Sequence, residues 1–474
     1  MSGAATTVYD EVAYPSAVFL QTHPNRLALL AKLHGLNPPP IDTARVLEIG
    51  GGDGMNLLSM ATAFPDAHFF NFDLAPSAVE KGHRLGIAAG LTNFRCEVGD
   101  IVTMHERIAP GSYDYVIVHG VYAWVPDFVR EAAMALVAHA LSSDGVAFVS
   151  FNTNPGGHVR MIMRDMMLHL LAPVTGIKPR IAAARQFLNE YQTPREGDDA
   201  VVALARLQAA SMLGRPDEVL FHDELGDCFN PQTLTQVIDA ANANGLNFLT
   251  DAGTNRTVDG FVNATEGDLT ALAVRTAQTD DYMAMRFFRQ VVLVRGEVTP
   301  ARTPDLGALM KLYIAGRFHP KDGGVFEIGD ATIETQDPAL VKTLAAISDI
   351  WPRYARIDSV TTNTEHALGL LTLYHKGVIF MSPLPERFTL EISQRPVASP
   401  VIRAQIKRGD LSVVTLSHEP LKIEDEAARG LIVSLDGTND RAALEAFWET
   451  LPHHSAVSLD QALNAVAYQR LLIA

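Results

Sequence analysis

Between residues 45 and 151 the chain alternates between two patterns of hydrophobic and polar positions. Short runs that are apolar at nearly every position are separated by stretches in which apolar residues return every third or fourth position. Continuous apolar runs are typical of parallel strands that are covered on both faces, and the longer period is that of amphipathic helices. This alternation predicts βαβ units around a parallel sheet.

We expect five strands in this region and two more further along the chain, which together complete a seven-stranded sheet. The expected strands are 45–49, 68–74, 93–98, 113–119, 145–151, 246–252 and 287–295. In front of the first strand, "THPNRLALLAKLHG" predicts a helix with Pro24 in its first turn and Gly35 as its stop.

About 95 residues separate the fifth strand from the sixth, far more than a crossover needs. The helical pattern of this stretch predicts an inserted domain. After the last strand, "GEVTPARTPD" reads as a link to an accessory domain, in which 337–381 suggests helices followed by a short hairpin, compatible with a winged-helix-like unit. The predicted organisation is a core of 1–154 plus 229–297, a helical insertion or regulatory domain of 155–228, and an accessory domain of 298–474.

Composition and charge narrow the choice of partners. With 47% hydrophobic and 19% charged residues, the chain is typical of a globular protein. A net charge of −16 argues against nucleic acid or an anionic membrane, and favours a cationic or neutral substrate. The two cysteines form neither a disulfide framework nor a zinc spacing, and no apolar stretch reaches 18 residues. We expect a cytoplasmic protein without a membrane span.

The strongest local signal is "VLEIGGGDGMN" at 46–56, which follows a strand and opens a helix. Gly50, Gly52 and Gly54 allow a tight turn and the close approach of a ligand. A dinucleotide fingerprint would need a glycine where Met55 stands. The spacing G-x-G-x-G after the acidic Glu48 resembles motif I of class I S-adenosylmethionine-dependent methyltransferases. The resemblance implies S-adenosylmethionine as the cofactor.

Further cofactor contacts are expected at the ends of the second and third strands. Asp73 stands 19 residues beyond Gly54, where a carboxylate can accept hydrogen bonds from both ribose hydroxyls. In the family, an acid after the third strand lies near the adenine amino group, which corresponds to Asp100, with Ile101 packing on the ring. The cofactor contacts expected around the glycine loop and the second strand are completed by Asn56 and Leu74.

A wider resemblance covers most of the chain. Several segments look, in order and spacing, like the methyltransferases that carry a predicted methyltransferase regulatory domain, among them the rickettsial-type protein lysine methyltransferases. These segments are 9–27, 46–61, 119–126, 150–157, 221–234 and 287–290. The resemblance implies a seven-stranded, Rossmann-like class I fold. It also leads us to expect that the N-terminal segment around Tyr14, Gln21 and His23 closes over the cofactor.

The segment "HGVYAWVP" follows the fourth strand, at the edge of the sheet where ligands bind in open α/β folds. Tyr122 and Trp124 could form an aromatic wall that orients an amine by cation–π attraction. Alternatively, both rings pack against the following helix. His119 is expected to contact the cofactor, and the acceptor's proton is expected to be removed either by bulk solvent or by a residue such as Tyr122 or His119.

Three functions remain open at this point. The leading one is N-methylation of lysine in a protein or peptide. The second is N- or O-methylation of a small natural product, and the third is a regulatory protein that binds S-adenosylmethionine without turnover. A metal site is not expected, because the His, Asp, Glu and Cys residues of 222–228 match no tetrahedral spacing.

Overall fold

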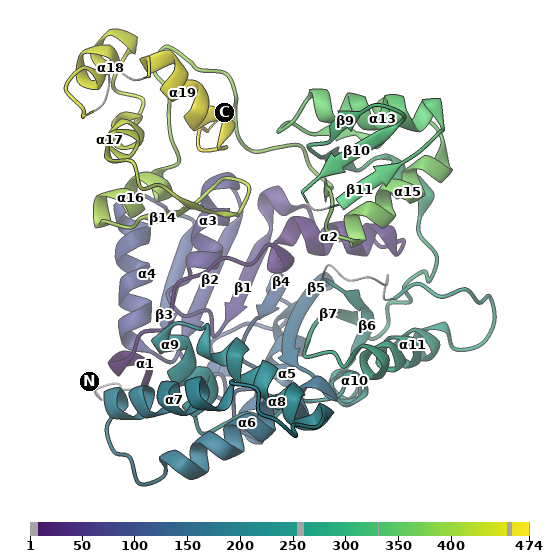
Figure 1. Cartoon of the computed structure of the whole chain (residues 1–474). Helices are drawn as coiled ribbons and strands as arrows, with labels where there is room; N and C mark the ends of the chain where they lie inside the picture. The colour runs from purple at the N-terminus through teal and green to yellow at the C-terminus, as the bar shows by residue number, and fades with distance from the viewer. Residues whose placement is uncertain (1–7, 254–259, 330, 453–456, 474) are drawn as a thin grey trace.

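A computed structural model describes residues 8–253, 260–329, 331–452 and 457–473. At its centre lies one seven-stranded sheet with helices on both faces (Figure 1). The strands are β1 (Arg45–Ile49), β2 (His68–Asp73), β3 (Phe94–Val98), β4 (Tyr113–Val118), β5 (Leu141–Asn152), β6 (Leu246–Asp251) and β7 (Phe288–Arg295). All seven expected strands are confirmed, although β5 begins four residues earlier than its expected start at 145.

The strand order is β3-β2-β1-β4-β5-β7-β6, and only β7 runs antiparallel to its neighbours. After β1 the chain adds β2 and β3 on one side of β1, and it then crosses to the other side of β1 to form β4. Strands β1 and β4 are adjacent and parallel. At such a reversal the two crossovers diverge and leave a crevice beyond the carboxyl ends of the strands. The Rossmann-like fold class is confirmed, and by this rule the crevice is expected after Ile49 and Val118.

Two apolar cores cover the two faces of the sheet. One contains α2 (Pro24–Leu33) and α3 (Met55–Ala63), and the other contains α5 (Asp127–Ala140), α10 (Leu234–Ala243) and α11 (Leu269–Ala284). Helix α4 (Pro76–Ala88) packs beside β3. The expected first helix is confirmed as α2, which has Pro24 at its first position and is followed by Gly35 at φ +74°.

The insertion between β5 and β6 is helical, as expected. It consists of α6 (Gly156–Leu171), α7 (Ile177–Tyr191), α8 (Ala200–Leu213), α9 (Asp217–Val219) and a π-helical turn η4 (Leu220–Glu224), and it has an apolar core of its own. In Figure 1 this bundle lies below the sheet. Since it begins directly after the carboxyl end of β5, it stands beside the edge of the sheet that carries the crevice.

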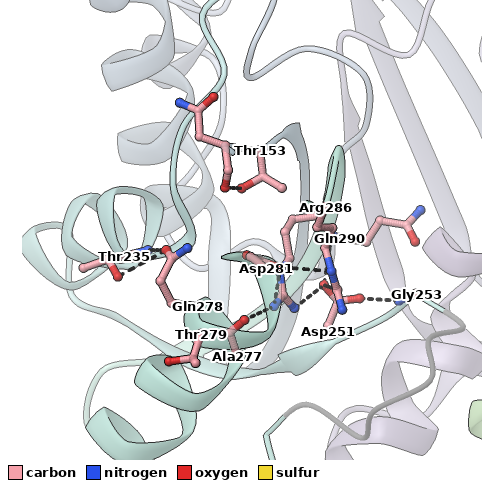
Figure 2. Close-up of polar contacts among 12 residues, drawn as sticks. Thr153, Thr235, Asp251, Gly253, Ala277, Gln278, Thr279, Asp281, Arg286 and Gln290 are labelled. Atoms are coloured by element: carbon pink, nitrogen blue, oxygen red, sulfur yellow. Dashed lines mark hydrogen bonds and ion pairs between the residues drawn. The ribbon is translucent and has the colours of Figure 1, made fainter. Parts of the chain in front are cut away.

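A buried ion cluster fastens α11 to β6 and β7, and Figure 2 shows its contacts. Arg289 is fully buried, and its guanidinium lies 3.1 Å from Asp251 Oδ2 and 2.9 Å from Asp281 Oδ1. Arg286 Nε lies 2.9 Å from the same oxygen of Asp281. The carbonyl of Arg286 accepts a hydrogen bond from Gly156 N at 3.0 Å, so the cluster also fixes the entrance to the insertion. Breaking one member would leave a buried charge unpaired.

The C-terminal region consists of two units with different cores. The first unit, residues 306–382, shares one apolar core with α2 and the sheet; Leu309, Ile314 and Leu370 belong to it together with Leu27. Its elements are α12 (Leu306–Met310), β8 (Tyr313–Ala315), β9 (His319–Lys321), β10 (Val325–Ile328), β11 (Ala331–Glu334), α13 (Pro338–Asp349), β12 (Ala355–Arg356), α14 (Ile357–Val360), α15 (Thr364–His375) and β13 (Phe380–Ser382). The short hairpin expected near 378–381 is not formed, because β13 pairs with β8.

The second unit, residues 390–473, has a separate core around Ile402, Leu431 and Leu463. Its elements are α16 (Pro400–Arg408), β14 (Ser412–Val414), β15 (Pro420–Lys422), α17 (Glu426–Ser434), α18 (Arg441–Trp448) and α19 (Leu459–Tyr468). Helix α16 packs on α3 and α4, so this unit touches the helix that follows the glycine loop (Figure 1).

Candidate active site

The loop between β1 and α3 is built from glycine for two separate reasons. Gly50, Gly52 and Gly54 have φ values of +70°, +58° and +66°, in the left-handed region that favours glycine. Gly51 has no such φ, but a Cβ there would lie 2.3 Å from Asn71 Oδ1. Gly51 was not singled out from the sequence; its requirement arises from a neighbour on β2 and not from its own backbone conformation.

Asp73, at the end of β2, braces this loop. One carboxylate oxygen accepts a hydrogen bond from Gly52 N at 2.8 Å, and the other accepts from Ala75 N at 2.9 Å. Burial raises the pKa of Asp73 above its usual range. Because each carboxylate oxygen can accept two hydrogen bonds, Asp73 retains acceptor capacity for ligand hydroxyls while it orders the loop.

Glu48, at the end of β1, is buried and only half satisfied. Its Oε1 accepts a hydrogen bond from Asn56 Nδ2 at 2.8 Å, whereas Oε2 is buried and finds no partner among the residues that the structure describes. Burial raises the pKa of Glu48 to about 8. A buried acceptor oxygen without a partner, beside a loop that is mostly glycine, is an environment that a cationic group of a ligand would complete.

Asn56, the second residue of α3, joins three parts of the chain. Its Nδ2 donates to Glu48 Oε1 at 2.8 Å and to Thr22 Oγ1 at 2.9 Å. Its Oδ1 accepts from Phe19 N at 3.0 Å and lies 2.9 Å from Nε2 of His418. An amide side chain offers two donor hydrogens and two acceptor positions, so all four are in use. Asn56 therefore has no hydrogen bond left for a cofactor, and we assign it to the support of Glu48.

The N-terminal segment lies along the same edge, through α1 (Val8–Glu11) and η1 (Leu20–Thr22). Asp10 accepts a hydrogen bond from Ser77 N at 2.9 Å, at the start of α4. Further on, Ser16 Oγ donates to Asp53 Oδ2 in the glycine loop. Val12 O lies 2.6 Å from a ring nitrogen of His222 in the insertion. The segment therefore bridges the insertion, α4 and the glycine loop.

The three residues singled out in this segment occupy different environments. Tyr14 is exposed, and its hydroxyl lies 3.4 Å from Asp223 of the insertion. Gln21 is half-buried within η1. His23 caps α2 by accepting a hydrogen bond from Asn25 N at 3.1 Å, and burial lowers its pKa to about 4. His23 is thus explained by helix capping, while the closure of the segment over a cofactor stays a prediction.

On the acceptor side, His119 follows β4 and lies among aromatic rings. Its ring centroid is 3.9 Å from that of Phe19 and 6.1 Å from that of Phe288. Its Nδ1 lies 2.9 Å from Ser150 Oγ on β5, and burial lowers its pKa to about 4. Phe19, Ser150 and Phe288 come from three distant segments, and no local sequence signal links them to His119.

The environments of Tyr122 and Trp124 favour the alternative that both rings pack within the protein. Tyr122 is only 3% exposed, and burial raises its pKa to about 12, so its phenol keeps its proton at neutral pH. The Trp124 ring is covered by the guanidinium of Arg160, 4.8 Å from its centroid, and Phe229 lies 4.7 Å away. The cation–π position expected for a substrate amine is already filled by an arginine of the insertion.

Three residues expected to contact the cofactor, two of them at the adenine ring, lie together at the ends of β2 and β3. Leu74 is exposed directly after Asp73, and Ile101 is half-buried against the core. Asp100 is exposed and accepts a hydrogen bond from Val102 N at 3.0 Å. Gly99 N donates to Asp73 O at 3.0 Å, which brings the two strand ends side by side.

Away from this edge, a cavity of about 870 Å³ lies between α10 and α11 beside the edge strand β6, lined by Ile238, Asn247 and Gln278 among others. None of the residues expected in the site lines it. Within the parts of the chain that the structure describes, no group of three or more His, Cys, Asp or Glu side chains could hold a metal ion.

Comparison with known proteins decides the family. The chain matches the family models described as methyltransferase domain over residues 46–145 and predicted methyltransferase regulatory domain over 216–295. It is 31% identical over 473 residues to the uncharacterised protein RP789 of Rickettsia prowazekii, covering 92% of this chain and 84% of that protein. The chain belongs to the class I S-adenosylmethionine-dependent methyltransferases of the rickettsial PKMT type.

The chain is also similar to a second relative and to a solved structure. The uncharacterised protein RP028 of the same organism is 31% identical over 234 residues, covering 49% of this methyltransferase and 93% of that protein. The structure of PKMT2 from Rickettsia typhi in complex with AdoHcy has a TM-score of 0.81 at 22% identity, covering 97% of this chain and 100% of that chain. The methyltransferase therefore has the PKMT2 fold along nearly its whole length.

The family models also correct one placement made from the sequence. The model described as PKMT, C-terminal winged helix domain matches residues 394–470 of the methyltransferase. The pattern of two helices and a hairpin had placed a winged-helix-like unit at 337–381, which belongs instead to the first C-terminal unit. Residues 390–473 are called the winged-helix unit below.

No helix in the described part of the chain is long and apolar enough to cross a membrane.

Proposed function

We propose that this methyltransferase transfers a methyl group to the side-chain amine of lysine in a protein or peptide. The observation that carries the proposal is the open, aromatic acceptor edge. Phe288, which begins β7 next to His119, and Phe287 just before it are 38% and 41% exposed. A closed apolar pocket would suit a small natural product, whereas an exposed aromatic rim suits the aliphatic stem of a lysine that enters from solvent.

The cofactor half of the site supports this reaction. The bare backbone of the glycine loop admits the ligand, Asp73 accepts from the ribose hydroxyls, and Oε2 of Glu48 accepts from the ammonium group. Leu74 and Ile101 flank the adenine, and Asp100 accepts from its amino group. When bound, S-adenosylmethionine supplies a methyl group on a positively charged sulfur, which is an already activated donor.

On the acceptor side, the protein orients an uncharged amine. A lysine amine has a pKa of about 10.4 and must lose a proton before its lone pair can attack. The pKa of His119 is about 4, too low to take that proton efficiently, so we assign proton removal to bulk solvent. The imidazole of His119 and the rings of Phe19 and Phe288 form an aromatic surface at this edge, against which the aliphatic stem of the lysine packs.

The proposal is tested by incubating the protein with methyl-labelled S-adenosylmethionine and a cell lysate. Label should enter the protein fraction, and hydrolysis of that fraction should release methylated lysine. Label only in the small-molecule fraction would favour methylation of a natural product. Cofactor binding without any transfer of label would favour the regulatory alternative. Gly51→Ala, which blocks the cofactor loop, is the control that should abolish labelling.

A further inference from the structure

A histidine of the winged-helix unit reaches the glycine-loop helix. His418 lies in the turn between β14 and β15, 362 positions after Asn56, with a φ of +61° and 4% exposure. Its ring nitrogens lie 2.9 Å from Asn56 Oδ1 and 2.6 Å from Ser59 Oγ, both on α3. A non-glycine residue with positive φ in a buried turn is strained unless its surroundings hold it there. The two contacts with α3 provide that restraint.

The hydrogen-bond network fixes which ring nitrogen carries the proton. Asn56 Oδ1 accepts from the backbone N–H of Phe19, which can only donate, so this atom is the amide oxygen. His418 Nε2 must therefore donate to it. In a neutral imidazole Nδ1 then accepts, and the donor is the hydroxyl of Ser59. Burial and the neighbouring ring of His23, 5.1 Å away, hold the pKa of His418 well below its usual value, in keeping with a neutral ring.

Glu48 depends on this arrangement. Its only hydrogen bond among the described residues comes from Asn56 Nδ2. If the Asn56 amide turned by half a rotation, its oxygen would face Glu48 Oε1 and the donor would be lost. Two N–H groups, those of His418 and Phe19, specify the correct orientation by pointing at Oδ1.

We propose that His418 is a positioning residue for cofactor binding: it holds Asn56 in the orientation that presents Glu48 to the ligand, and so couples the winged-helix unit to the glycine loop. The inference rests on the proposed role of Glu48 in the cofactor site. It gives the winged-helix unit a function beyond packing, because a displacement of the turn between β14 and β15 would change the orientation of Asn56 and Glu48 beside the glycine loop.

Two conservative variants separate positioning from packing. In His418→Gln the side-chain nitrogen takes the place of ring Nε2 and keeps the donor to Asn56. In His418→Asn the nitrogen takes the place of ring Nδ1 and keeps only the contact with Ser59. The full-length protein is titrated with S-adenosylhomocysteine by calorimetry, and the melting temperature of each variant is measured without ligand. His366→Gln, at a buried histidine paired with Asp337 in the first C-terminal unit, is the matched control.

We expect His418→Asn to weaken binding by about tenfold, the equivalent of one hydrogen bond, and His418→Gln to bind within about twofold of the wild type. This difference should persist when the two variants melt at the same temperature, and it should vanish in an Asn56→Ala background. Equal affinities of the Gln and Asn variants would overturn the inference. Because the readout is binding, this failure is distinct from failure of the proposed lysine transfer, which only the labelling experiment addresses.

Discussion

The two halves of the site at the carboxyl edge of the sheet are built differently. The cofactor half consists of consecutive residues, from Glu48 to Asn56, joined by Asp73 from the adjacent strand. The acceptor half is assembled from Phe19, His119 and Phe288, which lie a hundred or more residues apart from one to the next around β4. The first half is concentrated in one short stretch of chain and the neighbouring strand, and the second depends on long-range packing. Substitutions should therefore have sharply different effects in the two halves.

The largest effect is expected at Gly51. Gly51→Ala places a Cβ 2.3 Å from Asn71 Oδ1 and 2.7 Å from the side chain of Glu48, so the loop or these two side chains must shift. Because Glu48 belongs to the proposed cofactor site, we expect cofactor affinity to fall by about a hundredfold. Calorimetric titration with S-adenosylhomocysteine measures it. Gly369→Ala, in α15 with open space around the new methyl group, is the control and should leave binding unchanged.

Asp73→Ala should have the next largest effect, because it removes both the brace on Gly52 N and the acceptor for the ribose. We expect a loss of about 1–3 kcal/mol in cofactor binding. The same titration measures this loss. Undiminished affinity in the variant would remove Asp73 from the site.

Phe288→Ala should impair the acceptor half and leave the cofactor half intact. Removal of an exposed ring next to His119 takes apolar surface from the acceptor half only. We expect the KM for the protein acceptor to rise by about 5- to 30-fold, equivalent to about 1–2 kcal/mol, with cofactor affinity unchanged. Steady-state methylation assays at saturating S-adenosylmethionine test this, and a parallel loss of cofactor affinity would contradict the division into halves.

Glu48 should couple cofactor binding to the release of a proton. Its pKa of about 8 in the folded protein lies above the ordinary value of 4.5, so at pH 7 the free protein holds the proton. A cationic ligand favours the ionised form, and binding at pH 7 should release close to one proton. Calorimetry in two buffers of different ionisation enthalpy counts that proton. Glu48→Gln should release none.

The raised pKa of Glu48 also makes the free energy of unfolding depend on pH. Because the pKa is raised in the folded state, the stability that Glu48 contributes is fully present below pH 4.5 and is lost as the pH rises through about 8. Denaturant unfolding at a series of pH values should therefore show a decline over this window. In Glu48→Gln the decline should be smaller, and an identical decline would show that Glu48 is not its source.

The smallest effect is expected at Tyr122. Its hydroxyl is buried and keeps its proton, so Tyr122→Phe should leave kcat within about twofold and change no pH profile. Methylation rates across pH 6–9 provide the check. A large fall in kcat would restore Tyr122 as a catalytic residue and reverse the assignment of proton removal to solvent.

These differences explain what could be predicted from sequence. The strands and the glycine loop follow from short-range patterns, because buried strands need apolar runs and left-handed turns need glycine. The burial of Tyr122 could not be inferred, because the local sequence around an aromatic residue after a strand is the same whether its ring faces a substrate or the core. The covering of Trp124 by Arg160 depends on how the insertion folds back, which no local pattern encodes. In the accessory domain expected from 298, nothing local shows that Leu309 and Leu370 pack with Leu27.

The shared core of α2 and the first C-terminal unit has a consequence for biosynthesis. Leu27 and Leu30 are synthesised early, but their partners Leu309, Ile314 and Leu370 emerge some 280 to 340 residues later. At about 5–20 residues per second, this apolar surface waits roughly 15 to 70 seconds on the ribosome before it can be covered. During that interval the nascent chain is a target for chaperones, and a ribosome that stalls before Leu370 leaves a methyltransferase whose sheet is complete but whose helix α2 is uncovered on the side that packs on the first C-terminal unit.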